Sequence, residues 1–105
     1  MEYVKQITGR FKNDNREEGL KIIAKFWNAK VGKVKGLTAF VLMANLHDSH
    51  GATNTTVWET KEDMDAYYSN DMNYQMLLRQ IKPMMEEELE RREYTIFKAK
   101  MKESH

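Results

Sequence analysis

Residues 55–72 of the chain read TTVWETKEDMDAYYSNDM, and this stretch carries the clearest structural pattern in the sequence. A strand is expected from about Asn54 to Glu59, because β-branched and aromatic side chains dominate residues 55–58. Thr60 then fits a helix N-cap, with an acidic residue at the reciprocal position three residues later. The helix that follows places Tyr67 on its buried side, and the polar residues 69–71 interrupt it. The stretch therefore predicts a strand, one amphipathic helix and a polar break.

A strand and a helix are predicted upstream, near the start of the chain. Residues 3–12 alternate between two faces, which is typical of a strand. Residues 15–31 carry apolar side chains at helical spacing and form one buried stripe. Asn15 fits the N-cap of this helix, and Gly32 fits its C-terminal stop.

The strongest predicted strand covers residues 37–46 and begins after Gly36. Phe40 lies on one face and Met43 on the other, and both faces are apolar along the strand. A strand in an antiparallel sheet that is covered on one side alternates with polar residues. Each face of this strand is therefore expected to be covered, although the predicted helices can cover only one.

The C-terminal third predicts a third helix and a last strand. Residues 74–81 have apolar side chains at helical spacing, and we expect Pro83 to kink the helix or to restart it in a new first turn. Two acidic–basic pairs then stand one helical turn apart on the exposed side: Glu87 with Arg91, and Glu88 with Arg92. The last strand is expected at residues 94–101, and residues 102–105 form a frayed, disordered tail.

The predicted order is strand, helix, strand, strand, helices, strand. This is the order of the split βαβ, ferredoxin-like fold, an α+β fold in which helices cover one face of a four-stranded antiparallel sheet. The other face includes one apolar side of residues 37–46 and needs a second molecule to cover it. We therefore expect an obligate homodimer that forms by packing two sheets face to face.

Composition excludes several other classes of protein. The chain has 105 residues, which fits a single domain, and its net charge of +1 indicates neither a nucleic-acid surface nor a membrane surface. It has no cysteine, which excludes disulfides, thiol catalysis and thiolate metal sites. No apolar run is long enough to span a bilayer, so a cytoplasmic protein is expected.

Residues 56–72, together with Gly36 and Leu37, resemble the antibiotic-biosynthesis-monooxygenase family. The order of elements is similar to that family over nearly the whole chain. The resemblance implies a dimeric α/β barrel, with a small-molecule cavity between the sheet and the helices of each subunit. The family includes cofactor-free quinol and polyketide monooxygenases, haem-degrading enzymes, and proteins with no known activity.

The resemblance also bears on haem and histidine chemistry. Haem-degrading members use an asparagine on the first strand, a tryptophan in the second helix and a histidine in the third. These positions fall near Ile7, on Tyr67 and on Leu77. Many quinol-type members have histidines at the positions of Tyr67 and Met72. The resemblance therefore implies no axial haem ligand and no histidine-assisted proton transfer, so we expect no cofactor and no haem degradation.

Five side chains are candidates for lining the cavity: Gln6, Trp58, Tyr67, Met72 and Met76. Trp58 can stack on a planar ligand or simply anchor the core. Tyr67 can donate a hydrogen bond to a substrate oxygen or be a core residue whose hydroxyl reaches water. The two methionines stand one turn apart and can form a flexible wall or pack ordinarily. No residue is identified as catalytic.

The segment His47-Asp-Ser-His50 places two imidazoles and a carboxylate close together. Zinc needs at least three ligands in fixed geometry, so a solvated loop is the expected interpretation and no metal site is predicted. No phosphate-binding loop or hydrolase triad is present in the sequence either.

Three functions remain as hypotheses. The first is a cofactor-independent monooxygenase in which an aromatic quinol or polyketide-like substrate itself reacts with dioxygen, while Gln6 or Tyr67 stabilises the resulting anion. The second is a non-catalytic module that binds an aromatic or lipophilic small molecule. The third is a structural dimer. Oxygen consumption separates the first hypothesis from the second, and ligand-dependent melting separates the second from the third.

Overall fold

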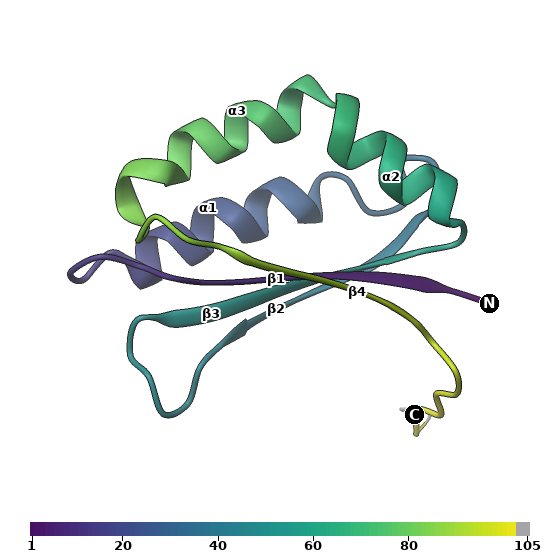
Figure 1. Cartoon of the computed structure of the whole chain (residues 1–105), viewed down its shortest axis with the longest axis horizontal. Helices are drawn as coiled ribbons and strands as arrows, with labels where there is room; N and C mark the ends of the chain where they lie inside the picture. Colours follow the sequence, from purple (N-terminus) through teal and green to yellow (C-terminus); the bar gives the residue numbers. More distant parts are fainter. Residues whose placement is uncertain (103–105) are drawn as a thin grey trace.

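A computed structural model of the chain describes residues 1–102. Its elements follow in chain order: β1 (Tyr3–Arg10), α1 (Arg16–Asn28), β2 (Leu37–Ala44), β3 (Gly51–Trp58), α2 (Lys61–Asn70), α3 (Met72–Ile81), the 3₁₀ turn η1 (Lys82–Met84) and β4 (Glu90–Thr95). The strands form one antiparallel sheet in the order β2-β3-β1-β4. All three helices lie over the same face of that sheet (Figure 1). This confirms the predicted α+β, ferredoxin-like architecture.

The core lies between the helices and the sheet, and aromatic rings fill much of it. Trp27 of α1 and Trp58 of β3 are almost completely buried. They belong to a cluster whose neighbouring ring centroids lie between 4.9 and 6.5 Å apart: Phe26, Trp27, Trp58, Tyr67, Tyr68 and Tyr74. Tilted and edge-on pairs dominate this cluster, as the charge distribution of aromatic rings favours.

Local capping fixes both ends of α2. The hydroxyl of Thr60 accepts a hydrogen bond from the backbone N–H of Asp63 at 3.0 Å, as predicted. Asp71 follows α2 and is also the N-cap of α3, where its carboxylate accepts from the N–H of Tyr74 at 2.8 Å. Gly36, before β2, has a φ of +83°, and a Cβ there would lie 2.5 Å from the Asp63 carboxylate. The polar break and the glycine before β2 are therefore structural requirements.

Four predicted boundaries are wrong in the first two thirds of the chain. Strand β1 ends at Arg10 and not at residue 12, because Phe11 pairs only in an isolated bridge with Met85. Helix α1 ends at Asn28, and Gly32 lies four residues later in a loop with a φ of +82°. Strand β2 ends at Ala44, so Leu46 is exposed in the following loop. Strand β3 begins at Gly51, because its backbone pairs with the whole length of β1.

The last strand is displaced more seriously from its predicted position. It spans Glu90–Thr95 and not residues 94–101, and the residues before it are not helical. The backbone N–H of Glu86 already donates to the carbonyl of Arg10 at 2.8 Å, so the chain is extended immediately after η1. The predicted helical pairing of Glu87 with Arg91 and of Glu88 with Arg92 is therefore wrong. The predicted tail falls on Lys102, which is exposed, and on residues 103–105, which lie outside the described residues.

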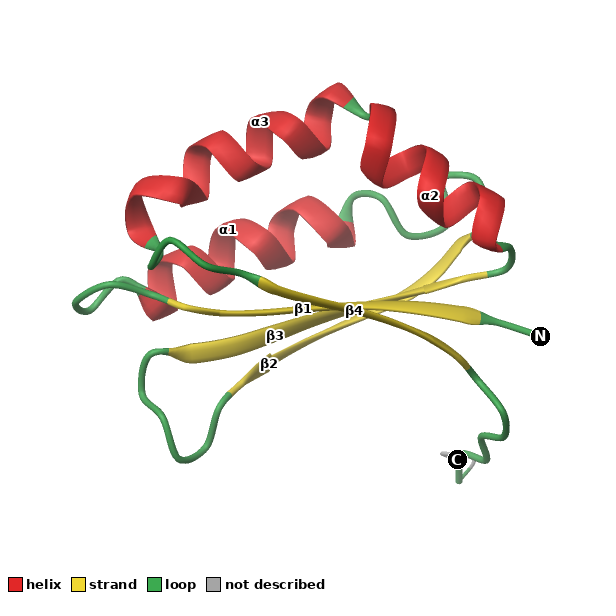
Figure 2. Cartoon of the chain, in the orientation of Figure 1, coloured by secondary structure: helices red, strands yellow, loops and turns green. Residues whose placement is uncertain are grey.

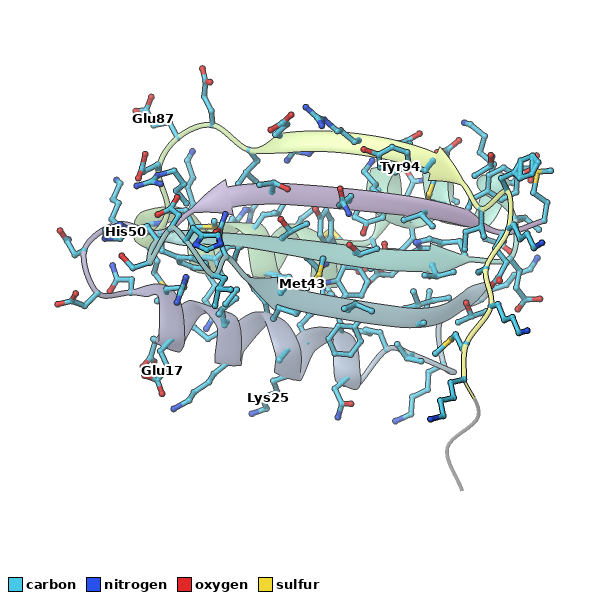
Figure 3. All side chains as sticks on the ribbon, turned by 90° about the horizontal axis from the view of Figure 1, so that it is seen from below. Glu17, Lys25, Met43, His50, Glu87 and Tyr94 are labelled. Carbon is cyan, nitrogen blue, oxygen red and sulfur yellow. The ribbon has the colours of Figure 1, made fainter. Side chains whose placement is uncertain are left out.

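The second face of the sheet carries no helix among residues 1–102 (Figure 2). Met43 and Tyr94 lie on this face, as the view from below shows (Figure 3). Val41, Met43 and Tyr94 are 50%, 43% and 46% exposed, values that are high for apolar side chains in a sheet. We call this surface the open face and the opposite one the covered face. No helix in the described part of the chain is long and apolar enough to cross a membrane.

Candidate functional site

A small cavity lies between the covered face of the sheet and helices α1 and α3, with a volume of about 50 Å³. Strands β1, β2 and β3 supply its floor, and the segment after α3 closes one end. Large apolar and aromatic side chains form most of the wall: Phe11, Trp27, Leu42, Tyr74, Leu77 and Met85. Such a lining is typical of sites that bind flat, largely apolar ligands.

Asn54 is the carboxamide in this apolar lining. It stands in the middle of β3, opposite Ile7 of β1 and Leu42 of β2, with its side chain on the covered face. Its Oδ1 atom is buried and has no hydrogen-bond partner among residues 1–102. A buried polar atom without a partner destabilises a fold by about 1–3 kcal/mol. A ligand hydroxyl in the cavity would supply the missing partner.

The polar group next to Asn54 on the same face is fully paired. Thr56 accepts a hydrogen bond from the indole Nε1–H of Trp58 at 2.9 Å. The hydroxyls of Thr56 and Tyr68 lie 2.8 Å apart and share a second hydrogen bond. These bonds fix the indole and the phenol against the sheet. The covered face therefore satisfies Thr56 internally and leaves Asn54 available.

The tyrosines around the site are neutral hydrogen-bonding groups at physiological pH. Burial raises the pKa of Tyr74, which lines the cavity, and also raises the pKa of Tyr68 above its usual range. The positive charge of Arg91 on β4 acts on both phenols in the opposite direction. Arg91 stands opposite Ile7 in the sheet and so belongs to the covered face. It brings a cationic group close to an otherwise apolar region.

Two of the five predicted pocket residues lie on strands, and neither lines the cavity. Gln6 points to the open face, where its Nε2 donates to the hydroxyl of Thr55 at 3.3 Å. Trp58 is on the covered face but is fully buried in the aromatic cluster, next to α2. Gln6 is therefore separated from the cavity by the sheet, and Trp58 occupies the position of a core anchor.

The other three predicted pocket residues lie on α2 and α3, outside the cavity wall. The side chain of Tyr67 is 7% exposed, and its hydroxyl is buried with no partner among residues 1–102. Burial, and next the charge of Asp71, raise the pKa of Tyr67. Met72 and Met76 are 74% and 61% exposed, because α3 turns Tyr74, Leu77 and Ile81 toward the sheet instead. Helices α1 and α3 enclose the cavity, and no residue of α2 contributes to its lining.

The sequence did contain a signal for Asn54, although the predicted site omitted it. Ala52, Asn54, Thr56 and Trp58 alternate with residues of the opposite face, so a strand through them places the carboxamide in the core. Buried asparagines are uncommon unless they are paired. Whether this one was paired could be seen only in the three-dimensional structure.

The loop between β2 and β3 is held by arginines. The Nη1 of Arg16 donates to the backbone carbonyls of Asn45 and Asp48 at 3.1 and 2.8 Å, and Arg10 forms an ion pair with the Asp48 carboxylate. The Nδ1 of His50 lies 3.9 Å from the same carboxylate. Within residues 1–102, no three histidine, aspartate or glutamate side chains are arranged to hold a metal ion. The loop is held by these contacts to β1 and α1.

No family model matches the sequence, and no curated protein is similar to it. Among solved structures, a candidate antibiotic biosynthesis monooxygenase from Nitrosomonas europaea superposes with a TM-score of 0.79 at 16% identity, covering 91% of this chain and 90% of that one. A second one, from Chloroflexus aurantiacus, gives 0.76 at 18% identity, with 96% and 98% covered. SnoaB, a cofactor-independent oxygenase from Streptomyces nogalater, gives 0.77 at 11% identity, with 93% and 95% covered. The chain therefore has the fold of the antibiotic-biosynthesis-monooxygenase-like proteins.

Proposed function

We propose that the protein is a cofactor-independent monooxygenase that acts on an aromatic, quinol- or polyketide-like small molecule. The observation that carries this proposal is the unpartnered Oδ1 of Asn54 in an apolar cavity. The similarity in fold to SnoaB, a cofactor-independent oxygenase, supports it. In this site the sheet is the floor, α1 and α3 are the walls, and Asn54 is the group that fixes the substrate's oxygen.

The reaction needs little from the protein if the substrate supplies its own electrons. An anthrone-like substrate carries a CH₂ group opposite a carbonyl in its central ring, and loss of a proton from this CH₂ gives an electron-rich aromatic enolate. That anion reacts with dioxygen, so CH₂ becomes C=O, one oxygen atom stays in the product and the other leaves as water. The apolar wall surrounds the reacting ring, while the Oδ1 of Asn54 accepts a hydrogen bond from the substrate's phenolic or enolic hydroxyl and the Nδ2–H of the same carboxamide is the group that donates to the developing oxyanion.

The alternative is a protein that binds an aromatic or lipophilic metabolite and performs no chemistry. The raised pKa of Tyr74 favours this reading, because a phenol that stays neutral at physiological pH is a poor general base. For the monooxygenase function, by contrast, the substrate's own acidity would have to supply the enolate. Binding without oxygen uptake is the expected behaviour of this second function.

Oxygen-electrode measurements with anthrone test the proposal. We expect uptake of one dioxygen for each anthraquinone formed, at a rate above the spontaneous reaction. Asn54→Ala should lower this rate by about 10²-fold, the usual effect of removing a group that stabilises an oxyanion. Gln6→Ala, on the open face, is the matched control and should keep the rate. If Asn54→Ala retained full turnover, the site would be misassigned; anthrone-dependent melting shifts without turnover would favour the binding function.

We further propose that the protein is a homodimer that buries the open face. Val41, Met43 and Tyr94 are half-exposed there, and the helices of the described chain all cover the other face. Stable dimers of this kind commonly bury about 2,000 Å² or more. Two copies packed by these faces would enclose β2, the strand that is apolar on both sides.

Sedimentation equilibrium at low micromolar concentration tests this assembly. The wild-type protein should sediment at twice the 12.5 kDa mass of the chain, and Met43→Asp should yield the folded monomer because it buries an unpaired charge. Met76→Asp is the control, since Met76 is exposed on α3, and it should stay dimeric. A folded wild-type monomer would rule out the interface.

A further inference from the structure

A wider groove at the surface adjoins the cavity. This groove has a volume of about 720 Å³ and lies beside the segment that joins α3 to β4. Four side chains line both spaces and form the partition between them: Leu78, Ile81, Met85 and Leu89. Met85 and Leu89 belong to the connecting segment, which has no regular structure after η1 apart from a bridge at Met85. They are therefore the parts of the partition that can move most easily.

The inner cavity is too small for the proposed substrate class as it stands. An apolar cavity that accommodates one benzene ring has a volume of about 150 Å³, roughly three times that of the space beside Asn54. Gly9 faces the same region, and a Cβ built on it would lie 2.6 Å from Leu89 and 2.8 Å from Met85. The two flexible side chains thus fill the room above Gly9. If they turn into the groove, cavity and groove become one space.

The groove has a surplus of unpaired positive charge. Lys12, Lys82 and Arg91 line it, and none of them forms a salt bridge with another residue of the described chain. The groove also contains two carboxylates. Glu86 is paired with Arg10 at 3.1 Å, so Glu87 is the carboxylate of this groove that forms no salt bridge within residues 1–102. An anionic group at this surface would meet more cations than anions.

We propose that the ligand carries an anionic group, which stays in the groove at Lys12 and Lys82 while its aromatic part passes between Met85 and Leu89 to Asn54. The ligand is thus an aromatic acid with a phenolic or enolic oxygen at its far end. This inference rests on the proposed function, because it assumes that Asn54 is the inner binding group. It adds a charge requirement and a route of entry, neither of which the proposed function needs.

Three matched probes separate these requirements by isothermal titration calorimetry. The first, 6-hydroxy-2-naphthoate, has a phenol at one end of the rings and a carboxylate at the other. The second, 6-hydroxy-2-naphthamide, lacks the charge, and the third, 2-naphthoate, lacks the hydroxyl. We expect the first probe to bind tightest. The double variant Lys12→Gln, Lys82→Gln should weaken both carboxylate probes about fivefold to tenfold and leave the amide unchanged, with a smaller difference at high salt.

A second pair of lysines provides the control for this experiment. Lys25 and Lys30 line a different groove, between α1 and α3, to which no residue of the connecting segment contributes. The double variant Lys25→Gln, Lys30→Gln has the same net charge as the test variant and should bind all three probes as the wild type does. Asn54→Ala should weaken only the two probes that carry a hydroxyl.

The outcomes distinguish this inference from the proposed function. Suppose that 6-hydroxy-2-naphthoate and 6-hydroxy-2-naphthamide bind with equal affinity, and that Asn54→Ala still weakens the binding of both. This result would overturn the charge requirement alone. Equal affinities of all probes for wild type and Asn54→Ala would overturn the inner site, and the inference with it. Binding by none of the three probes would also overturn both.

Stopped-flow fluorescence tests the route of entry, since Trp27 lines the cavity and reports binding. Leu89→Ala should raise the association and dissociation rate constants of 6-hydroxy-2-naphthoate severalfold, because the partition becomes smaller. Met84→Ala is the control: Met84 is a neighbouring, partly buried residue that lines neither space. An association rate constant that Leu89→Ala leaves unchanged would overturn entry between Met85 and Leu89.

Discussion

The two faces of the sheet differ in which side chains they leave exposed or without a hydrogen-bond partner. On the open face the polar side chains pair with one another: Thr8 with Thr53 at 2.9 Å, and Gln6 with Thr55 at 3.3 Å. Its apolar side chains, such as Met43, remain half-exposed. On the covered face the apolar side chains are buried, and the carboxamide of Asn54 is left without a partner. Each face therefore has one kind of unsatisfied group, apolar on one side and polar on the other.

This contrast indicates where the protein meets other molecules. Contact with another apolar surface stabilises an exposed apolar surface, because both are removed from water. On the open face the partner would be a second copy of the chain. A buried amide without a partner is stabilised by a hydrogen bond to any group that is small enough to reach it. The covered face therefore suits a ligand and the open face suits a protein partner.

The largest expected difference between the faces concerns stability. Trp58→Ala on the covered face should lower the free energy of unfolding by about 3–5 kcal/mol, because it opens a cavity and breaks the hydrogen bond to Thr56. Val57→Ala, the next residue on the open face, should cost no more than half as much. Urea denaturation at one fixed protein concentration measures both. Equal losses would show that the open face is as tightly packed as the covered one.

Alkaline pH should act through the covered face. The pKa values of Tyr67, Tyr68 and Tyr74 are raised above the unfolded value near 10, so the folded state holds these protons while the unfolded state releases them. Stability is therefore fully present below about pH 10 and falls as the pH rises further. Urea midpoints from pH 8 to 11, with tyrosinate absorbance as the probe, measure this.

One variant sharpens the interpretation of the alkaline experiment. Tyr68→Phe removes one of the three groups, so its stability should decline less steeply above pH 10 than that of the wild type. Parallel curves for wild type and Tyr68→Phe would contradict the assigned role of burial.

The smallest expected effect has the opposite sign. Asn54→Leu replaces the unpartnered amide by an apolar group of similar shape and should raise the free energy of unfolding by about 1 kcal/mol. Thr56→Val at the neighbouring position should lower it, since both hydrogen bonds to Trp58 and Tyr68 are lost. Thermal melting of the two variants makes the comparison. A destabilised Asn54→Leu would mean that the amide serves the fold and not a ligand.

Most of the fold could be predicted because its signals are local. Thr60 and Asp71 cap helices through bonds to backbone groups three residues away, and alternation identifies the inner strands. The position of strand β4 could not be predicted for a physical reason. Glu90–Thr95 is an edge strand that is exposed along its length, so it carries no apolar alternation. Its position is fixed by backbone pairing with β1, which leaves no mark in the side-chain pattern.

The candidate site was harder to predict than the fold. Asn54 and Thr56 occupy equivalent positions on one face of β3. Thr56 forms hydrogen bonds because the side chains of Trp58 and Tyr68 extend to it, whereas no side chain of the described residues extends to the Oδ1 of Asn54. The spacing of Met72 and Met76, one helical turn apart, predicts that both side chains line the cavity. That spacing is correct, but the break at Asp71 sets the direction of α3 and turns them to solvent. Pairing and helix direction are properties of the assembled molecule.

Gly9 determines how readily this architecture can change its ligand. It is the point on the covered face where a single added methyl group would meet two flexible side chains rather than backbone. Alanine at this position would push Met85 and Leu89 outward, and so redistribute volume between the inner and outer spaces without touching a polar group. Selectivity for ligand size can therefore be altered separately from the chemistry at Asn54. For protein engineering, position 9 is the first to vary when a larger or smaller ring system is to be accepted.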